Sequence, residues 1–183
     1  MFEDPDFGQR YVDRWSELRT NVFAASNLLA RIDAWAAFLQ EPAARNFARW
    51  PILGQPVGPE SFDAKTFEEN AQHLRSWITN RLGWIDAQFP PAPVAVSSNG
   101  LVALSLPAGA VLATGVVRRI VFTLDGTDPR QPGGAVSPTA RAYDQPFPAA
   151  PAAPIFARLQ EAERWSGPLR VKFDPPLSAS KVP

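Results

Sequence analysis

The sequence predicts an α+β protein whose helices and strands are segregated along the chain. Five of the six tryptophans lie before residue 90, whereas fifteen of the twenty prolines lie from Pro90 onward. The first part carries apolar residues at helical spacing, and the second carries short β-branched runs between turn signals. We therefore expect an N-terminal helical bundle followed by an antiparallel β-sandwich.

The first expected helix begins just after Pro5. Its apolar residues recur at steps of four, four and three, namely Phe7, Tyr11, Trp15 and Leu18. This spacing places them on one face, which we expect to be buried. Gln9 and Asp13 fall on the opposite, solvent-facing side.

A second helix is expected from Ser26, a plausible N-cap, to Pro42. Its buried side would carry Leu29, Ile32, Trp35, Ala36 and Leu39. A short third helix would follow over residues 42–50, closed by Pro51.

Thr66 and Glu69 have the spacing of a capping box, which predicts the start of the last helix. Apolar residues then continue at helical spacing to Phe89, which predicts a helix of about six turns.

Three prolines in residues 90–93 predict a stiff linker between the two parts. The expected division is a helical segment over 1–89, the linker 90–93, a β-sandwich over 94–174 and a disordered tail over 175–183. Strands are expected at residues 94–97, 101–106, 111–114, 119–124, 155–159 and 169–173. The fourth enters a turn at Asp125-Gly126, where glycine supplies a positive φ and Pro129 fixes the exit. Residues 146–154 would form a surface connection.

Composition excludes several classes of function. The net charge is zero, and the two halves carry about −3 and +3 with scattered basic residues, so we expect no nucleic-acid partner. No apolar run approaches the roughly 20 residues of a membrane span. Cysteine is absent, and the acidic N-terminus does not have the pattern of a signal peptide.

The residues that could take part in catalysis or metal binding are each explained by a structural role. His73 is the only histidine and is expected to be a partly solvated helix residue. Glu68 and Glu69 are first-turn carboxylates. Asp125 and Asp128 could hold calcium, but we expect both to cap backbone N–H groups of their turn.

The sequence therefore predicts no catalytic, cofactor-binding or metal-ligating residue. Gly133-Gly134 precedes no helix and is expected to be a turn rather than a phosphate cradle. Tyr143 and Trp165 are possible ligand contacts, because an exposed ring in the sandwich could stack on a sugar.

Two family resemblances add to these expectations. The segments FEDPDFGQRYVDRWSELR, NLLARIDAWAAFL, RNFARWPILG and LRSWITNRLGWIDAQF resemble the C-terminal helical end of bacterial CotH (spore-coat-protein-H) kinase-family proteins. The string FTLDGTDPR, with Gly133-Gly134, IFAR and Trp165-Ser166, resembles the chitobiase/β-hexosaminidase C-terminal module. This second resemblance covers about residues 93–174 and implies an immunoglobulin-like sandwich.

The kinase-family resemblance implies no catalytic residue here, because no glycine-rich loop, strand lysine, His-Arg-Asp or Asp-Phe-Gly element is present. We expect the chain to begin inside the helical end of such a protein. The first hypothesis is a non-catalytic accessory segment that packs on a kinase-like core or self-associates, with no cofactor. The alternatives are a polysaccharide- or protein-binding β-module, and part of a kinase-like enzyme whose core lies elsewhere. The resemblance implies the bacterial envelope or exterior.

Overall fold

The computed structural model describes residues 3–56, 58, 62–110, 112, 114–148 and 153–173. The chain forms two compact units. One, which we name the helical unit, is Leu18–Asp86. The other, the β unit, combines the residues up to Glu17 with those from Ala87 onward.

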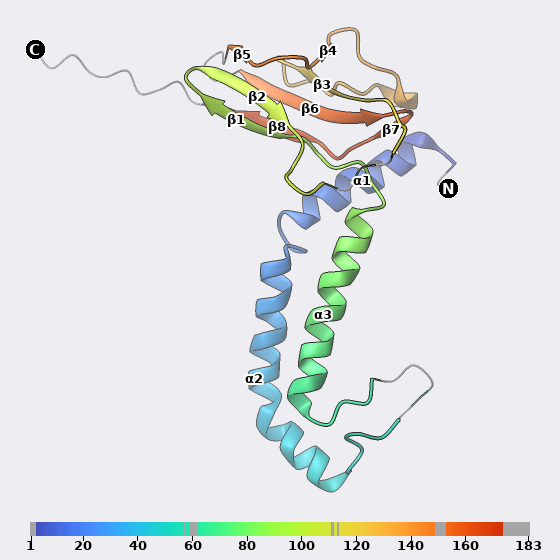
Figure 1. Cartoon of the computed structure of the whole chain (residues 1–183), viewed down its shortest axis with the longest axis vertical. Helices are drawn as coiled ribbons and strands as arrows, with labels where there is room; N and C mark the ends of the chain where they lie inside the picture. The colour runs from blue at the N-terminus through green and yellow to red at the C-terminus, as the bar shows by residue number, and fades with distance from the viewer. Residues whose placement is uncertain are drawn as a thin grey trace, which may run out of the picture. The chain divides into compact units, whose positions relative to one another are not determined.

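The expected α+β order is confirmed (Figure 1). The described helices come first: α1 (Pro5–Arg19), α2 (Ala25–Arg49) and α3 (Phe67–Asp86). The strands follow as β1 (Val94–Ser98), β2 (Leu101–Ser105), β3 (Arg118–Thr123), β4 (Arg141–Ala142), β5 (Phe147–Pro148), β6 (Pro154–Glu161), β7 (Arg164–Trp165) and β8 (Leu169–Lys172), with a short 3-10 turn at Pro132–Gly134.

All described strand pairs are antiparallel and form two sheets. One has the order β1-β2-β5, and the other has the order β4-β3-β6-β7, with β8 also paired to β6. Their shared core contains Val102, Leu104, Phe122, Ile155 and Ala157. Val102 and Leu104 on β2, like Ile155 and Ala157 on β6, are two residues apart, so the period-two alternation of each strand turns both side chains to the same face.

The turn after β3 has the expected conformation. Gly126 adopts φ +77°, and a Cβ at this position would approach the Pro154 side chain to 3.0 Å. Asp125 accepts hydrogen bonds from the Thr127 N–H at 2.9 Å and its hydroxyl at 2.6 Å. Asp128 accepts one from the Arg130 N–H at 2.9 Å. The turn-capping roles expected for both aspartates are confirmed.

Helix α2 corrects two predictions. It begins at Ala25, so Ser26 lies inside the helix and is not its N-cap, and it continues through Pro42 instead of ending there. The short helix expected over residues 42–50 is the last part of α2, which bends in this region (Figure 1). Pro42 is exposed, so water can satisfy the backbone carbonyl that the proline leaves without a donor.

Helix α3 starts with the expected cap. The Glu69 N–H donates to Thr66 Oγ1 at 3.1 Å, and the Glu69 carboxylate accepts from the Lys65 N–H at 2.6 Å. The helix ends at Asp86 rather than at Phe89. There Asp86 forms a two-point ion pair with Arg19, with distances of 2.9 to 3.0 Å. The pair joins the end of α1 to the end of α3.

Some expected segments fall partly outside the described residues. Residues 111 and 113 lie outside them, and Leu112 and Thr114, which are described, are not in a strand. Residues 149–152 of the expected connection and the expected tail 175–183 also lie outside. The strands β4, β5 and β7 are short additions that the sequence did not predict. No described helix is long and apolar enough to cross a membrane.

Candidate functional site

The strongest polar cluster of the β unit is centred on Arg158, in the middle of β6. Ile155 and Ala157 point into the sandwich core, so alternation places Arg158 on the opposite face of the sheet. Arg158 is nevertheless only 1% exposed. A buried guanidinium needs partners for all of its donors.

Arg158 finds those partners on three segments. Its Nη1 and Nη2 donate to the two carboxylate oxygens of Asp13 at 2.6 and 2.9 Å. Its Nε and Nη2 donate to the two oxygens of Asp128 at 2.8 and 2.6 Å. Nη1 also donates to the Ser166 carbonyl at 2.8 Å. These five bonds use every N–H of the guanidinium.

The charge balance of this cluster keeps Arg158 protonated. Burial by itself would lower the pKa of the guanidinium, but the bonds to Asp128 and Asp13 outweigh that effect and raise the pKa above its ordinary value. Asp13 comes from α1 and Asp128 from the turn after β3. The ion pairs therefore join a helix to a sheet within the β unit.

A second ion pair lies two helical turns earlier on α1. Asp6 accepts from Arg130 Nη1 at 2.7 Å and from the Gly133 N–H at 3.0 Å. The Gly133 hydrogen bond, followed by the bond from Arg130, lowers the pKa of the Asp6 carboxyl. Seven residues separate Asp6 from Asp13, so both carboxylates project from the same side of the helix.

Between the two ion pairs, α1 approaches the sandwich closely. Gln9 donates from Nε2 to the Ser166 carbonyl at 3.1 Å and to Asp13 Oδ1 at 2.8 Å. A Cβ added to Gly167 would overlap the side chain of Ser16. Glycine is therefore required at this position for α1 to lie where it does.

This contact corrects the expected orientation of α1 in part. The residues of the helix that are buried are Gln9 and Val12, whereas Phe7, Trp15 and Leu18 of the expected apolar face are half-buried and Tyr11 is 45% exposed. Tyr11 instead packs its ring 5.9 Å from that of Phe89. The apolar period located the helix correctly. The face is different because the buried Arg158 requires a carboxylate, which only the polar side of α1 supplies.

The other candidate residues of the sequence lie elsewhere. His73 is exposed and stacks on Phe62 with ring centroids 4.1 Å apart. Glu68 pairs with Arg75 at 2.9 Å, and Arg75 also binds Asp33 at 2.6 Å. Gly133 lies in the 3-10 turn with φ +79°. Within the described part of the chain, no three His, Cys, Asp or Glu side chains are grouped so as to hold a metal ion.

The two expected ligand-contact residues both lie in the β unit. Trp165 is 3% exposed, and its indole N–H donates to the Gly134 carbonyl at 3.0 Å. Tyr143 is half-buried and packs edge-on against Phe122 and Phe147. Trp165 therefore lies inside the fold, and Tyr143 alone of the two keeps part of its ring at the surface.

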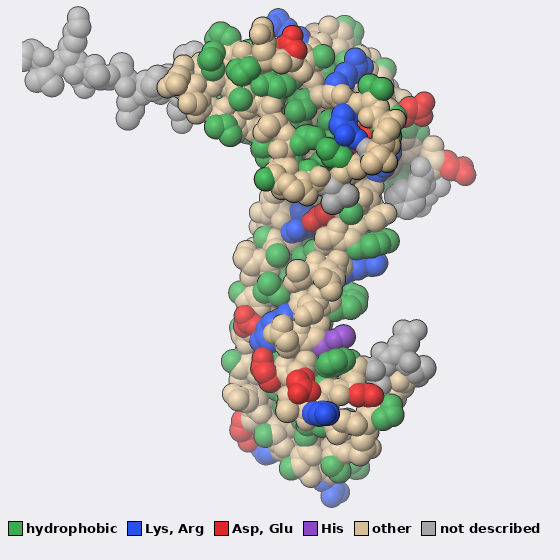
Figure 2. Space-filling model, viewed as in Figure 1, with side chains coloured by type: hydrophobic (Ala, Val, Ile, Leu, Met, Phe, Trp, Pro, Cys, Tyr) green, Lys and Arg blue, Asp and Glu red, His purple; other side chains and the backbone are tan. Residues whose placement is uncertain are grey.

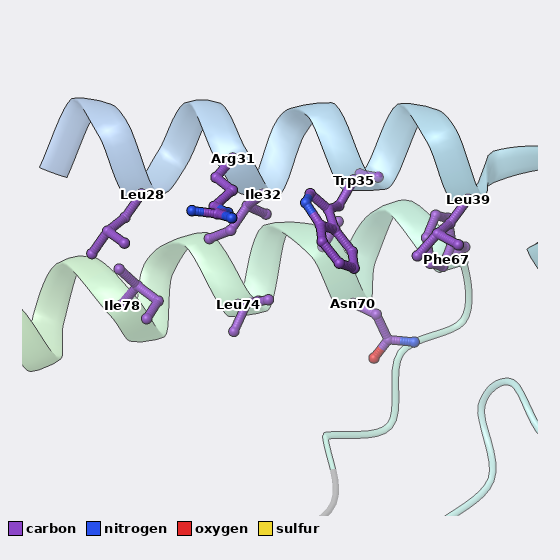
Figure 3. Close-up of a pocket in the computed structure, with 11 residues that line it drawn as sticks. Leu28, Arg31, Ile32, Trp35, Leu39, Phe67, Asn70, Leu74 and Ile78 are labelled. Atoms are coloured by element: carbon purple, nitrogen blue, oxygen red, sulfur yellow. The ribbon is translucent and has the colours of Figure 1, made fainter. Parts of the chain in front are cut away.

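The helical unit contains an apolar groove between α2 and α3 (Figure 3). Its volume is about 460 Å³. The residues that line it are Leu28, Arg31, Ile32, Trp35, Ala36, Leu39, Phe67, Asn70, Ala71, Leu74 and Ile78. Helix α2 buries none of its described residues, and hydrophobic side chains reach the surface along the helical unit (Figure 2).

Sequence reasoning did not identify the main residues of the Arg158 cluster. The apolar period predicts Asp13 on the solvent face of its helix, and Arg158 stands out only as part of the string IFAR. One signal was available, because an arginine in the middle of an apolar strand requires an acidic partner. The sequence does not indicate which of the chain's eighteen acidic residues that partner is.

Comparison with known proteins finds a family that part of the chain resembles. No curated protein and no solved structure matches the chain. The family model described as CotH kinase protein matches residues 1–85. These residues comprise α1, α2 and nearly all of α3. Residues 1–85 are thus similar to CotH kinase proteins.

Proposed function

We propose that the chain is a non-catalytic accessory segment similar to that of secreted CotH kinase-family proteins. In this proposal the α2–α3 groove packs against a kinase-like core, and the β-sandwich serves as an attached module. Its place would be the bacterial envelope or the exterior of the cell.

The observation that carries this proposal is the apolar groove of the helical unit. Trp35, which lines it, is 59% exposed, and the neighbouring Phe38 is 79% exposed. Large contiguous apolar surfaces on soluble proteins mark interaction sites. A helix pair with such a surface fits a role in covering a larger body.

Two further observations support an accessory role. The match to CotH kinase proteins covers the helices and stops before the sandwich. In addition, the carboxylates that could have served chemistry form structural bonds: Asp128 holds Arg158, and Asp125 caps its own turn.

The test compares two tryptophan variants of the full chain. If the groove normally covers a larger core, the isolated chain will bind an apolar dye and self-associate. Trp35→Ser should lower both dye fluorescence and the associated fraction measured by sedimentation. Trp77→Ser is the matched control, because Trp77 is also exposed but does not line the groove.

Two results would contradict the proposal. One is a strictly monomeric chain with no dye-accessible apolar surface at high concentration. The other is specific binding of Mg-nucleotide by the purified chain in calorimetry, which a non-catalytic segment would not show.

A further inference from the structure

One surface of the β unit is built to receive a helix. We define the helix-receptor surface as Arg130, Gly133, Arg158, Ser166 and Gly167. We propose that this surface is a binding site for an acidic amphipathic helix, which α1 occupies within its own chain and which residues 3–17 of a second copy can occupy in trans.

The chemistry of the two sides is complementary. The receptor offers two guanidinium groups, the Gly133 N–H and the Ser166 carbonyl. The helix offers the carboxylates of Asp6 and Asp13. Asp6 pairs with Arg130, and Asp13 forms a two-point pair with Arg158. Two-point arginine–carboxylate bonds are among the strongest and most directional in proteins.

The spacing of the contacts fixes the register of the helix. Asp6, Gln9, Asp13 and Ser16 lie at steps of three, four and three residues. At about 100° per residue these positions fall on one narrow stripe of a helix. Gln9, which lies between the two aspartates, donates from its amide to the Ser166 carbonyl at 3.1 Å, so the surface also recognises this residue.

The receptor also selects for size. Gly167 leaves room only for a small side chain, and Ser16 fills it. A helix with a larger residue three positions after the second aspartate would collide with the Gly167 backbone. The surface thus recognises an aspartate, a glutamine, a second aspartate and a small residue at these steps.

If α1 left the helix-receptor surface, the two arginines of that surface would lose the carboxylates that α1 supplies. Without α1, Arg158 and Arg130 would face Asp128 alone, and the site would have a net charge of about +1. A helix with two aspartates supplies the missing negative charge. This need does not involve the α2–α3 groove, so the inference is independent of the proposed accessory role.

The experiment vacates the receptor in the full chain. The variant Asp6→Lys/Asp13→Lys should release α1, and circular dichroism and near-ultraviolet spectra report whether the sandwich stays folded. A fluorescein-labelled peptide of residues 3–17 is then titrated by anisotropy. We expect it to bind the vacated chain and to bind the wild type far more weakly, because α1 already occupies that site.

Peptide and receptor variants test specificity. A peptide with Asp13→Asn should bind at least about tenfold more weakly, because the Arg158 ion pair is lost. A peptide with Arg14→Gln is the control and should bind unchanged, since the Arg14 side chain is 64% exposed and pairs with Glu17 of the same helix. Adding Arg158→Met to the vacated chain should abolish binding. Equal binding of the Asp13→Asn peptide, or no binding to a folded vacated chain, overturns the proposal.

A second measurement decides the matter if the vacated chain unfolds. A protease site inserted within residues 20–24 allows the folded chain to be cut between α1 and α2. The cut chain also carries Arg19→Gln, because Arg19 would otherwise hold the fragment to Asp86. The released fragment should co-elute with the remainder in gel filtration and separate only in denaturant. Separation of the fragment while the sandwich remains folded overturns the proposal.

Discussion

Arg158 and Asp13, 145 residues apart in the chain, form a two-point ion pair with distances of 2.6 and 2.9 Å. The pair joins the first helix to the central strand of the larger sheet. Because the match to CotH kinase proteins covers residues 1–85, the pair links the matched segment to a strand that lies outside this match. The compact β unit therefore does not coincide with the part of the chain that the family model covers.

Breaking this ion pair should destabilise the β unit strongly. Arg158→Met removes the guanidinium and leaves two carboxylates facing each other, which should cost about 3–5 kcal/mol of unfolding free energy. Asp13→Leu should cost less, because Arg158 keeps Asp128. The double variant should recover part of the loss, since an apolar pair of similar volume can replace a buried ion pair. Urea unfolding of the four proteins gives the coupling energy.

An exposed pair provides the control for this cycle. Arg14 and Glu17 lie 2.7 Å apart on the same helix, with both side chains largely in solvent. Arg14→Gln should change stability by less than about 0.5 kcal/mol. Equal losses for Arg14→Gln and Asp13→Leu would contradict the assigned importance of the buried contact.

The close approach at Gly167 predicts a steric effect. Gly167→Ala should cost about 1–3 kcal/mol, because the added methyl group overlaps Ser16 and forces α1 to move. Combining it with Ser16→Gly removes the overlapping side chain and should restore part of the stability. Thermal unfolding of the single and double variants measures this recovery.

Another glycine should respond with the opposite sign. Gly83 lies inside α3, and a Cβ added there meets no atom within 4 Å. Gly83→Ala should therefore stabilise the helical unit by about 0.5–1 kcal/mol through helix propensity. If Gly167→Ala were as stabilising as Gly83→Ala, α1 would not approach the sandwich as described.

The Asp6 ion pair predicts a dependence on pH. In the folded state, the Gly133 N–H and Arg130 lower the pKa of the Asp6 carboxyl below its ordinary value of 3.8. A carboxyl with a lowered folded pKa contributes stability that is complete above its unfolded pKa and is lost as pH falls through the folded pKa. Wild type should thus exceed Asp6→Asn in unfolding free energy at pH 7, and the difference should shrink below about pH 4.

Titration of the Asp6 carboxyl by NMR isolates the two causes. In Arg130→Gln the pKa of Asp6 should rise only part of the way to its ordinary value, because the Gly133 hydrogen bond is the larger cause and remains. A full return to the ordinary value in this variant would show that the Gly133 bond is not formed in solution.

Local chemistry explains which parts of the fold could be predicted. The Asp125-Gly126 turn depends on positive φ and on side-chain caps three residues apart at most, so the sequence alone specifies it. The same holds for the start of α3, where Thr66 and Glu69 cap the helix. The path of α2 through Pro42 was not predicted, because exposure of that turn to water reduces the cost of the missing hydrogen bond.

The candidate site depends on contacts between distant segments. Apolar periodicity indicated that Tyr11 would be buried and Asp13 exposed, whereas the structure buries Gln9 and Val12 and pairs Asp13 with Arg158. The residue pattern of one helix cannot predict a partner arginine that lies on a strand 145 residues later in the chain. Periodicity locates a helix, but a buried charge elsewhere can decide which side of it faces the sheet.

The long interval between Asp13 and Arg158 has a consequence for synthesis on the ribosome. At about 5–20 residues per second, roughly 7–30 s pass after translation of Asp13 before Arg158 is made. During that time the nascent first helix has no receptor, while the helical unit, Leu18–Asp86, is already complete in sequence. The β unit can therefore assemble only late, when its last strands emerge and capture a helix that was made first.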